Sequence, residues 1–268
     1  MARRPQIGDH LRAWRQRRRM SQLDLACEAN VSTRHLSFIE TGRAQPSRDM
    51  ILHLAERLEI PLRERNLWLV AAGYAPLFPE RSLDDPTLAA ARHAVDLVLT
   101  GHEPYPALAV DRHWNLVAAN RAVGRLIAGI APPLLQPPVN VLRLALHPEG
   151  LAPRTVNLAE WRAHLLARLQ RQIELTADRQ LLALSEELAR YPAPRQTGRP
   201  AMTGRDAAAV AVPLRLRVGE HVLAFFSTIT VFGTPLDITL SELALESFFP
   251  ADAATAEILR AAAATPSS

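Results

Sequence analysis

Hydrophobic residues recur at helical spacing between residues 7 and 73. A serine stands directly before each of the second, third and fourth hydrophobic segments, where its hydroxyl can accept a hydrogen bond from a free N–H group of the first helical turn. The three serines are Ser21, Ser32 and Ser47. Pro61 and Gly73 stand where a fifth segment begins and ends, as is typical of a helix. The pattern predicts an all-α domain of five short helices.

The period changes after residue 86. Residues 74–86, "YAPLFPERSLDDP", contain three prolines and predict a link between two domains. Residues 87–99 favour a helix, and residues 158–176 and 178–190 favour two more. The proline-rich stretch "IAPPLLQPPVN" predicts a loop.

Strand-like patterns lie among these helices. "YPALAV" and "NLVAAN" are joined by "DRHW", which predicts a hairpin. "AVAVPLRLRV" alternates, with Val210, Val212, Leu214, Leu216 and Val218 on one face. "HVLAFFSTITVF" is apolar on both faces, which predicts a strand in the middle of a sheet that is covered on both sides. The second domain is therefore predicted to be α+β.

The positive charge is concentrated in the first third of the chain. Residues 1–79 carry 13 arginines against 8 acidic residues, whereas the rest of the chain carries 18 against 19. The absence of lysine reflects a compositional bias, but that bias does not explain where the excess charge lies. A basic segment of this size indicates a polyanionic partner.

The third predicted helix presents two different faces. Leu36 and Ile39 fall on one side and are expected in the core, whereas Arg34 and Phe38 fall on the opposite side, with Ser37 and Thr41. Arginine can bind the edge of guanine through two hydrogen bonds, and an aromatic ring can contact a thymine methyl group. The alternative is that Phe38 packs on the second domain or on a partner subunit; we favour DNA contact.

The starts of the second and third helices, at Gln22 and Ser32, predict further contacts to DNA. Free N–H groups at a helix start attract phosphate. Gln22 lies just inside the second helix and can donate to the DNA backbone or to a base. Arg43, in the turn "TGRAQPS", lies where a phosphate strand would pass.

Residues 7–72 resemble the helix-turn-helix domain of the lambda-repressor-like, or XRE, family. "SQLDLACEANVSTRHLSFIETGRAQPS" carries the match through S-Q-x-x-L-A, V-S, I-E-x-G-R and P-S. The resemblance implies that the helix beginning at Ser32 enters the major groove of DNA. It places the usual contact positions at Gln22, Thr33, Arg34, Ser37 and Phe38. A polar residue is commoner at the last of these, so the base preference stays open.

The second domain resembles the ligand-binding domain of MmyB-like regulators, which is similar to a PAS fold. The matching segments include "PYPALAVDRHWNLVAAN", "NVLRLALHPEGLAP", "EWRAHLLARL" and "FFSTITVFGTPLDITLSELALESFFPADAAT". The resemblance implies a cavity for an apolar small molecule, with fatty acids among the types of occupant. We expect part of the apolar sequence to line this cavity, and we place Leu116, Leu165, Phe226, Thr228 and Phe232 on its wall.

A fatty acid needs a polar anchor for its carboxylate as well as an apolar wall. Arg143, between apolar residues, is the candidate anchor, although Glu160 is an alternative internal partner for it. Asn120 ends a strand, and we favour a role for it in capping the next helix over a role in binding.

The sequence does not indicate catalysis, a metal site or a cofactor. It contains no HExxH or CxxC motif, its histidines form no i, i+4 pair in the second domain, and Ser227 lies in a strand without a nucleophile elbow. The single cysteine, Cys27, cannot form an internal disulfide, which fits a reducing cytoplasm. The sequence contains no run of eighteen apolar residues, so it does not predict a membrane span.

We therefore predict a multidomain chain, with an all-α five-helix DNA-binding domain at 1–74, a link and connecting helix at 75–103 and an α+β, PAS-like domain at 104–268. We expect a cytoplasmic transcription regulator that binds double-stranded DNA, responds to a fatty-acid-like apolar ligand and forms a homodimer, because one short recognition helix reads few base pairs. Two alternatives stay open. The second domain could serve only dimerisation or protein contact, or it could be an enzyme fused to a DNA-binding module.

Overall fold

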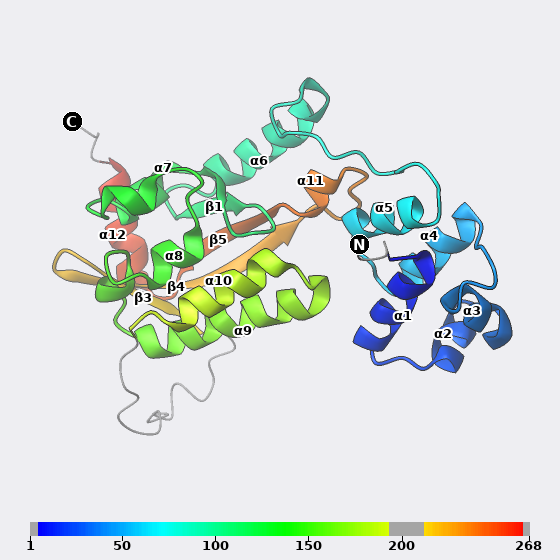
Figure 1. Ribbon diagram of the computed structural model, residues 1–268. Coiled ribbons are helices and arrows are strands. Elements are labelled where there is room, and N and C mark those ends of the chain that lie inside the picture. Colours follow the sequence, from blue (N-terminus) through cyan, green and yellow to red (C-terminus); the bar gives the residue numbers. More distant parts are fainter. Residues whose placement is uncertain (1–4, 193–211, 265–268) are drawn as a thin grey trace. The chain divides into compact units, whose positions relative to one another are not determined.

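The computed structural model describes residues 5–192 and 212–264 (Figure 1). It divides into two compact units. The first comprises residues 1–82 with residues 234–241, and the second comprises residues 83–233 with residues 242–268. Val210, which the alternating pattern placed on a strand, lies outside the described residues.

Five helices form most of the first unit, and the serine caps predicted from the sequence are present. Ser21, Ser32 and Ser47 each accept a hydrogen bond from the backbone N–H three residues later, and Asp24 completes a capping box with Ser21. The helices are α1 (Ile7–Arg17), α2 (Gln22–Glu28), α3 (Thr33–Glu40), α4 (Arg48–Arg57) and α5 (Leu62–Ala71). Their apolar faces meet in one core that contains Leu11, Leu25, Leu36, Ile39, Ile51 and Trp68.

α1 approaches α3 so closely that only glycine fits at the contact. A Cβ atom on Gly8 would lie 2.5 Å from the carbonyl oxygen of Ile39 and 2.8 Å from that of Glu40. These distances are shorter than ordinary van der Waals contact, so any larger residue would push the two helices apart. Gly8 therefore fixes the position of α1 against the end of α3.

The second unit is built on a five-stranded antiparallel sheet. Its strands are β1 (Ala107–Val110), β2 (Leu116–Ala119), β3 (Leu214–Val218), β4 (His221–Val231) and β5 (Ala244–Pro250), and their order across the sheet is β2-β1-β5-β4-β3. β1 and β2 form the predicted hairpin, with Ala109 opposite Ala118. β3 and β4 form a second hairpin, with Leu214 opposite Phe225. β5 lies between the two hairpins and joins them into one sheet.

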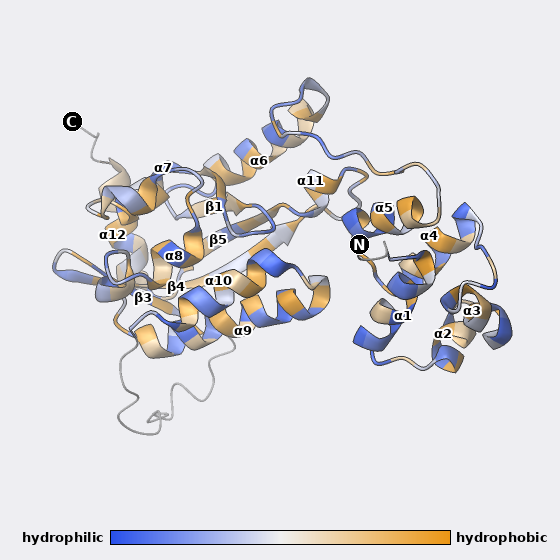
Figure 2. Ribbon diagram, in the orientation of Figure 1, coloured by the Kyte–Doolittle hydropathy of each residue, from blue (hydrophilic) through white to orange (hydrophobic). Residues whose placement is uncertain are grey.

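Helices cover both faces of this sheet. They are α6 (Ala89–Gly101), α7 (Arg121–Leu126), α8 (Val141–Leu146), α9 (Leu158–Thr176), α10 (Arg179–Ala189) and α12 (Ala253–Ala264), with short 3-10 turns at Pro86–Leu88, Pro132–Leu135 and Ala152–Arg154. α9 occupies the range predicted from the sequence, and α10 is one residue shorter at each end. Hydrophobic and hydrophilic residues alternate along both helices in Figure 2, so that each has one face to bury.

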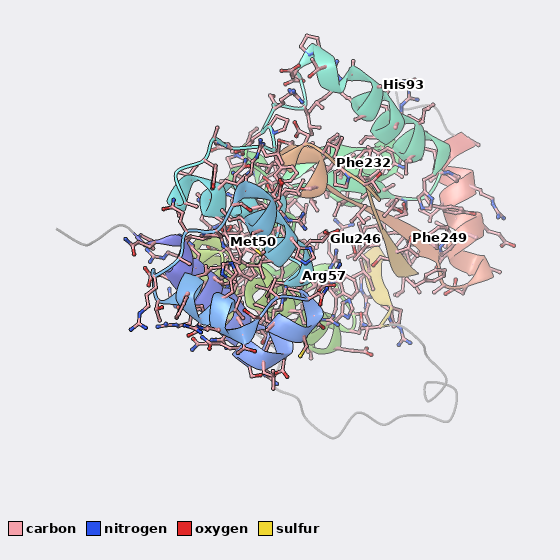
Figure 3. The ribbon with its side chains drawn as sticks, turned by 90° about the vertical axis from the view of Figure 1, so that its right-hand side faces the viewer. Met50, Arg57, His93, Phe232, Glu246 and Phe249 are labelled. Carbon is pink, nitrogen blue, oxygen red and sulfur yellow. The ribbon has the colours of Figure 1, made fainter. Side chains whose placement is uncertain are left out.

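The two faces of the sheet have different cores. On one face, Val95 and Leu99 of α6 pack against Ala107, Ala109 and Leu245. On the other face, α8, α9 and α10 pack against the sheet through a larger cluster that includes Trp114, Leu142, Leu165, Leu184, Leu216 and Phe225. Figure 3 shows the side chains that crowd around β5, with Glu246 and Phe249 labelled.

The prediction that β4 lies in the middle of a covered sheet is only partly correct. β4 is second from the edge, and β3 pairs with its first half only. Phe225 is fully buried, but Phe226, Ile229 and Val231 are 40%, 47% and 60% exposed. The second half of this strand is therefore partly exposed, although its sequence is apolar on both faces.

The connection between β4 and β5 packs with the first unit. It carries the short helix α11 (Ile238–Ser241), and residues 234–241 belong to the first unit. The backbone N–H of Ile238 donates to the carbonyl oxygen of Pro79, and the hydroxyl of Thr239 donates to that of Arg81. Asp237 pairs with Arg81 at 3.4 Å. Nothing in the sequence pattern predicted this association.

Candidate functional site

A buried carboxylate fixes the end of α3 in the first unit. The side chain of Glu40 has no exposed surface. It accepts hydrogen bonds from Arg15 of α1 at 2.6 and 3.0 Å and from Gln22 of α2 at 2.8 Å. Arg12 adds a longer contact at 3.4 Å. Glu40 thus connects all three helices through charged hydrogen bonds.

The electrostatics of this cluster favour the charged form of Glu40. Burial acts to raise the pKa of the carboxyl group, but the hydrogen bonds from Arg15 and Gln22 outweigh it and hold the pKa below its ordinary value. The same hydrogen bond to Glu40 raises the pKa of Arg15. Both groups therefore stay ionised, and the buried pair is complete at neutral pH.

The face of α3 opposite the core is open to solvent and carries the residues predicted to contact DNA. Leu36 and Ile39 are buried, as the helical spacing predicted. Arg34 is exposed, and its guanidinium carbon lies 5.3 Å from the centre of the half-buried Phe38 ring. Thr33 and Ser37 lie beside them on α3 and are partly exposed.

Two of the predicted DNA contacts, Ser32 and Gln22, have structural roles that limit what they can offer, whereas Arg43 keeps its side chain exposed. Ser32 is the N-cap of α3, and its hydroxyl oxygen accepts from the N–H of His35 at 3.1 Å. One N–H of the side-chain amide of Gln22 donates to Glu40, which leaves its second N–H and its carbonyl oxygen for another partner. Arg43 is exposed in the turn after α3, where its backbone N–H donates to the carbonyl oxygen of Phe38 at 2.8 Å.

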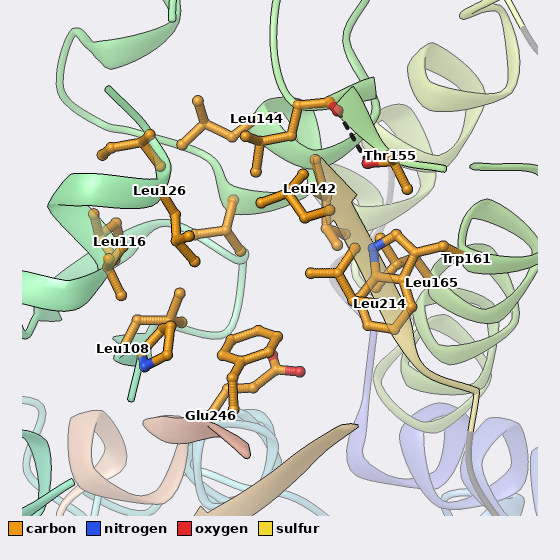
Figure 4. Close-up of a pocket in the computed structure, with 18 of the residues that line it drawn as sticks. Leu108, Leu116, Leu126, Leu142, Leu144, Thr155, Trp161, Leu165, Leu214 and Glu246 are labelled. Carbon is orange, nitrogen blue, oxygen red and sulfur yellow. Dashed lines mark hydrogen bonds between the residues drawn. The ribbon is translucent and has the colours of Figure 1, made fainter. Parts of the chain in front are cut away.

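The second unit contains a cavity of about 100 Å³ between the sheet and the helices α7, α8 and α9 (Figure 4). Its wall is formed almost entirely by hydrocarbon and aromatic side chains. The lining includes Pro106, Leu108, Trp114, Leu116, Val123, Leu126, Ile127, Val141, Leu142, Leu144, Leu151, Trp161, Leu165, Leu214, Leu216 and Phe248. An apolar wall of this kind suits an apolar ligand.

Two of the predicted ligand-binding residues line this cavity and four do not. Leu116 and Leu165 are part of the wall. Phe226 and Thr228 lie on the opposite face of β4, since they pair with Phe249 and Ser247 while Glu246 and Phe248 face the cavity. Phe232 packs in the cluster on the α6 side. The assignment of these three residues of the β4 segment to the cavity wall is therefore corrected.

Arg143 is the fourth predicted ligand-binding residue that does not line the cavity. It is paired with an internal acid instead. Its Nε and one terminal nitrogen both lie 2.7 Å from the carboxylate oxygens of Glu187, which also accepts from the hydroxyl of Tyr191 at 2.6 Å. These hydrogen bonds raise the pKa of Arg143, while burial and then Glu187 raise the pKa of Tyr191 to about 12. The alternative partner, Glu160, instead accepts from Asn157.

A charged pair that sequence reasoning missed lies at the cavity wall. Glu246 of β5 is part of the lining, although its side chain is only 6% exposed. Both its oxygens accept from Arg168 of α9, at 3.1 and 3.2 Å. The guanidinium of Arg168 lies 4.3 Å from the centre of the Trp114 ring. The signal available in the sequence was a single acidic residue at an inward position of the apolar run "LESFFP".

Several other polar groups near the cavity already have partners. Thr155 Oγ1 donates to the carbonyl oxygen of Leu151 at 2.9 Å, the dashed line in Figure 4. Trp114 Nε1 donates to Gln172 at 2.8 Å. His164 stacks on Trp161, with ring centres 5.3 Å apart, and burial followed by the charge of Arg168 holds its pKa below the ordinary value. His164 therefore stays neutral at neutral pH.

Asn120 caps α7, as expected from the sequence. Its side-chain oxygen accepts from the N–H groups of Val123 and Ala107, and its amide donates to the carbonyl oxygens of Leu99 and Tyr105. Among the described residues, no group of three histidine, cysteine or acidic side chains could hold a metal ion. Within the same residues, no helix has the length and hydrophobicity that a membrane span needs.

Comparison with known families agrees with both parts of this description. A helix-turn-helix domain matches residues 6–68, and the MmyB-like transcription regulator ligand binding domain matches residues 91–262. The chain is therefore a DNA-binding transcription regulator with a ligand-binding domain. Since the second match covers more than half of it, the chain belongs to the family defined by the MmyB-like transcription regulator ligand binding domain. A search of curated proteins found no match.

Proposed function

We propose that an apolar small molecule, held in the cavity of the second unit, controls the binding of this regulator to DNA. The observation that carries the proposal is the cavity with an apolar wall between the sheet and α7, α8 and α9. Close packing leaves few such spaces in a domain that serves only as a contact surface. The alternative, a second domain used only for dimerisation or protein contact, requires no cavity.

The size of the cavity bears on its occupant. Its volume is about 100 Å³, whereas a cavity of roughly 150 Å³ holds a benzene ring. The cavity as it stands therefore accepts a short apolar group. The hydrocarbon wall supports a long alkyl chain, like that of a fatty acid, as the proposed occupant whatever its polar end. Such a chain enters when leucine side chains of α7 and α8 move apart.

The DNA-binding surface is proposed to be the exposed face of α3 with the turn that follows it. Arg34 and Phe38 lie together on this face, and Arg43 lies just beyond it. Arg34 would read base edges, whereas Arg43 would contact phosphate. We also propose a homodimer, because pairing two such helices doubles the number of base pairs that are read.

A ligand bound in the cavity can act on the first unit through the chain segment that joins β4 to β5. Glu246 and Phe248 of β5 line the cavity, and residues 234–241 just before β5 pack against Pro79 and Arg81 of the first unit. A ligand that displaces β5 would therefore pull on residues that are attached to the chain segment following α5.

Fluorescence anisotropy on a duplex tests the DNA part of the proposal. Neutralisation of four to six phosphates gives a log–log salt slope of roughly −4 to −5 per bound unit. An affinity that does not change between low and moderate salt would contradict electrostatic binding by the basic unit.

Thermal unfolding with added apolar compounds tests the ligand part. A compound that binds the folded state alone raises the midpoint as its concentration rises. The same compound should change the affinity for the duplex. If the midpoint rises and the DNA affinity does not change, the second unit binds a ligand without regulating the first.

A further inference from the structure

The cavity wall, as the described residues form it, carries one acidic side chain and no basic one, and this limits the chemistry of the ligand. Among the described residues that line the cavity, Glu246 is the single charged residue. In Figure 4 it lies across the cavity from Leu144 and Thr155. A ligand that extends along the cavity toward Glu246 therefore meets a hydrogen-bond acceptor with a negative charge.

The partner of Glu246 does not reverse this polarity. Arg168 is not part of the lining, and it reaches both oxygens of the carboxylate with a single terminal nitrogen, at 3.1 and 3.2 Å. Its guanidinium lies over the Trp114 ring. The carboxylate is therefore the member of this pair that lines the cavity, and each of its oxygens keeps lone pairs for a second donor.

We infer that the cavity selects an apolar molecule whose polar end donates a hydrogen bond, namely an alkyl alcohol or an alkyl amine, and discriminates against the matching carboxylate. This inference rests on the proposed ligand-binding function and specifies its ligand class. A hydroxyl or ammonium group donates to the free lone pairs of Glu246. A carboxylate brings a second negative charge into an apolar space where screening by water is weak.

Apart from Arg168, which is bound to Glu246, the polar groups of the described residues near the cavity do not offset the repulsion of a carboxylate. Thr155 already donates to Leu151, and Trp114 Nε1 already donates to Gln172. The indole N–H of Trp161 is a neutral donor, which does not cancel the field of the acid. Arg143, the arginine expected from the sequence to hold a carboxylate, is bound to Glu187 outside the lining.

Binding of matched compounds to the full-length protein tests the inference. We would measure dissociation constants by titration calorimetry for 1-alkanols, alkylammonium salts and alkanoates of six, eight and ten carbons at pH 7. At each chain length the alcohol and the amine should bind at least about tenfold more tightly than the carboxylate, which corresponds to about 1.4 kcal/mol.

Two variants separate the role of Glu246 from a general effect of charge. Glu246→Gln offers both a donor and an acceptor, so the preference for alcohol and amine over carboxylate should fall to about threefold or less. Glu187→Gln makes the same change in an acid paired with an arginine outside the lining, and it should keep the wild-type preference. If Glu246→Gln does not fold, the wild-type series still decides the question.

The outcomes distinguish the inference from the function on which it rests. Carboxylates that bind as tightly as alcohols, in the wild-type protein, would overturn the inference and leave the proposed function intact. An unchanged preference in Glu246→Gln would also overturn it, because another group would then determine the selectivity. Failure of every compound at every chain length would refute the ligand-binding function itself, and the inference with it.

Discussion

Replacement of Glu40 by glutamine should destabilise the DNA-binding unit more than any exposed substitution in it. The side chain of Glu40 is fully buried and Arg15 is 10% exposed, so the substitution leaves a buried guanidinium without a counter-charge. Removal of one partner of such a pair costs about 3–5 kcal/mol. Because glutamine keeps the shape and one acceptor oxygen, we expect a loss near the lower limit, about 3 kcal/mol.

Hydrogen exchange measured by mass spectrometry suits this prediction because the chain contains its own reference. Peptides from α1, α2 and α3 should lose protection in Glu40→Gln, whereas peptides from α9 and α10 should not change. For a unit of this size, 1 kcal/mol shifts the midpoint by about 4–8 °C. The thermal midpoint of the first unit should therefore fall by more than about 10 °C.

The control is Glu28→Gln, which makes the same chemical change at an exposed position of α2. A second test combines Glu40→Leu with Arg15→Met, which removes the buried charges together and should recover most of the stability that Glu40→Leu loses. The reasoning is wrong if Glu40→Gln lies within about 0.5 kcal/mol of the control, the range of ordinary surface substitutions.

The same network predicts how the stability of the first unit depends on pH. The pKa of Glu40 is lower in the folded chain than in the unfolded chain. Its contribution is therefore fully present above the ordinary glutamate pKa of about 4.3 and is lost as the pH falls through the lower, folded value. Acid titration should destabilise the wild-type unit below about pH 4.3 more steeply than Glu40→Gln.

Three further predictions concern function. Arg34→Ala should cost roughly 1–3 kcal/mol on the preferred duplex and relax base preference, whereas Arg43→Ala should weaken binding to all duplexes about equally; equal behaviour on preferred and scrambled duplexes would contradict the assignment. Leu165→Trp should fill the cavity and abolish the ligand-dependent rise in thermal midpoint, as measured by calorimetry. Asp237→Ala should leave ligand affinity unchanged but reduce the effect of ligand on DNA affinity, as measured by anisotropy.

Local rules were sufficient to predict much of the first unit. A serine before an apolar segment caps the helix whether or not the rest of the fold is known, and the structure confirms the caps at Ser21, Ser32 and Ser47. Helical spacing also separated the buried Leu36 and Ile39 of α3 from its exposed Arg34. These features depend on neighbours within one or two turns, which the sequence displays directly.

The position of the cavity wall could not be predicted in the same way. Alternation in β4 correctly separated Phe226 and Thr228 from Phe225, but it did not show which set faces the cavity. That choice depends on which helices cover each face of the sheet. The cavity lies on the side of α9, and Phe226 lies on the other side.

Long-range pairs were equally inaccessible. Arg143 was expected to need a carboxylate, which was correct, but its partner Glu187 lies 44 residues away on α10. Glu246 pairs with Arg168 across 78 residues. Charge type and burial preference predict that such pairs form, whereas the identity of the partner depends on the tertiary fold.

The connection between β5 and α11 indicates what a regulatory ligand has to do. α11 ends at Ser241 and β5 begins at Ala244, and Leu243 between them is buried against α6. Because this short segment is packed, it cannot easily absorb a movement of β5.

A ligand changes DNA affinity only if it binds two arrangements of the chain with different affinities. A molecule that fills the apolar cavity without touching Glu246 or Phe248 would therefore bind without regulating, whereas one that displaces these β5 side chains would change the position of residues 234–241. Ligands should accordingly separate into binders and effectors according to whether they contact Glu246 or Phe248.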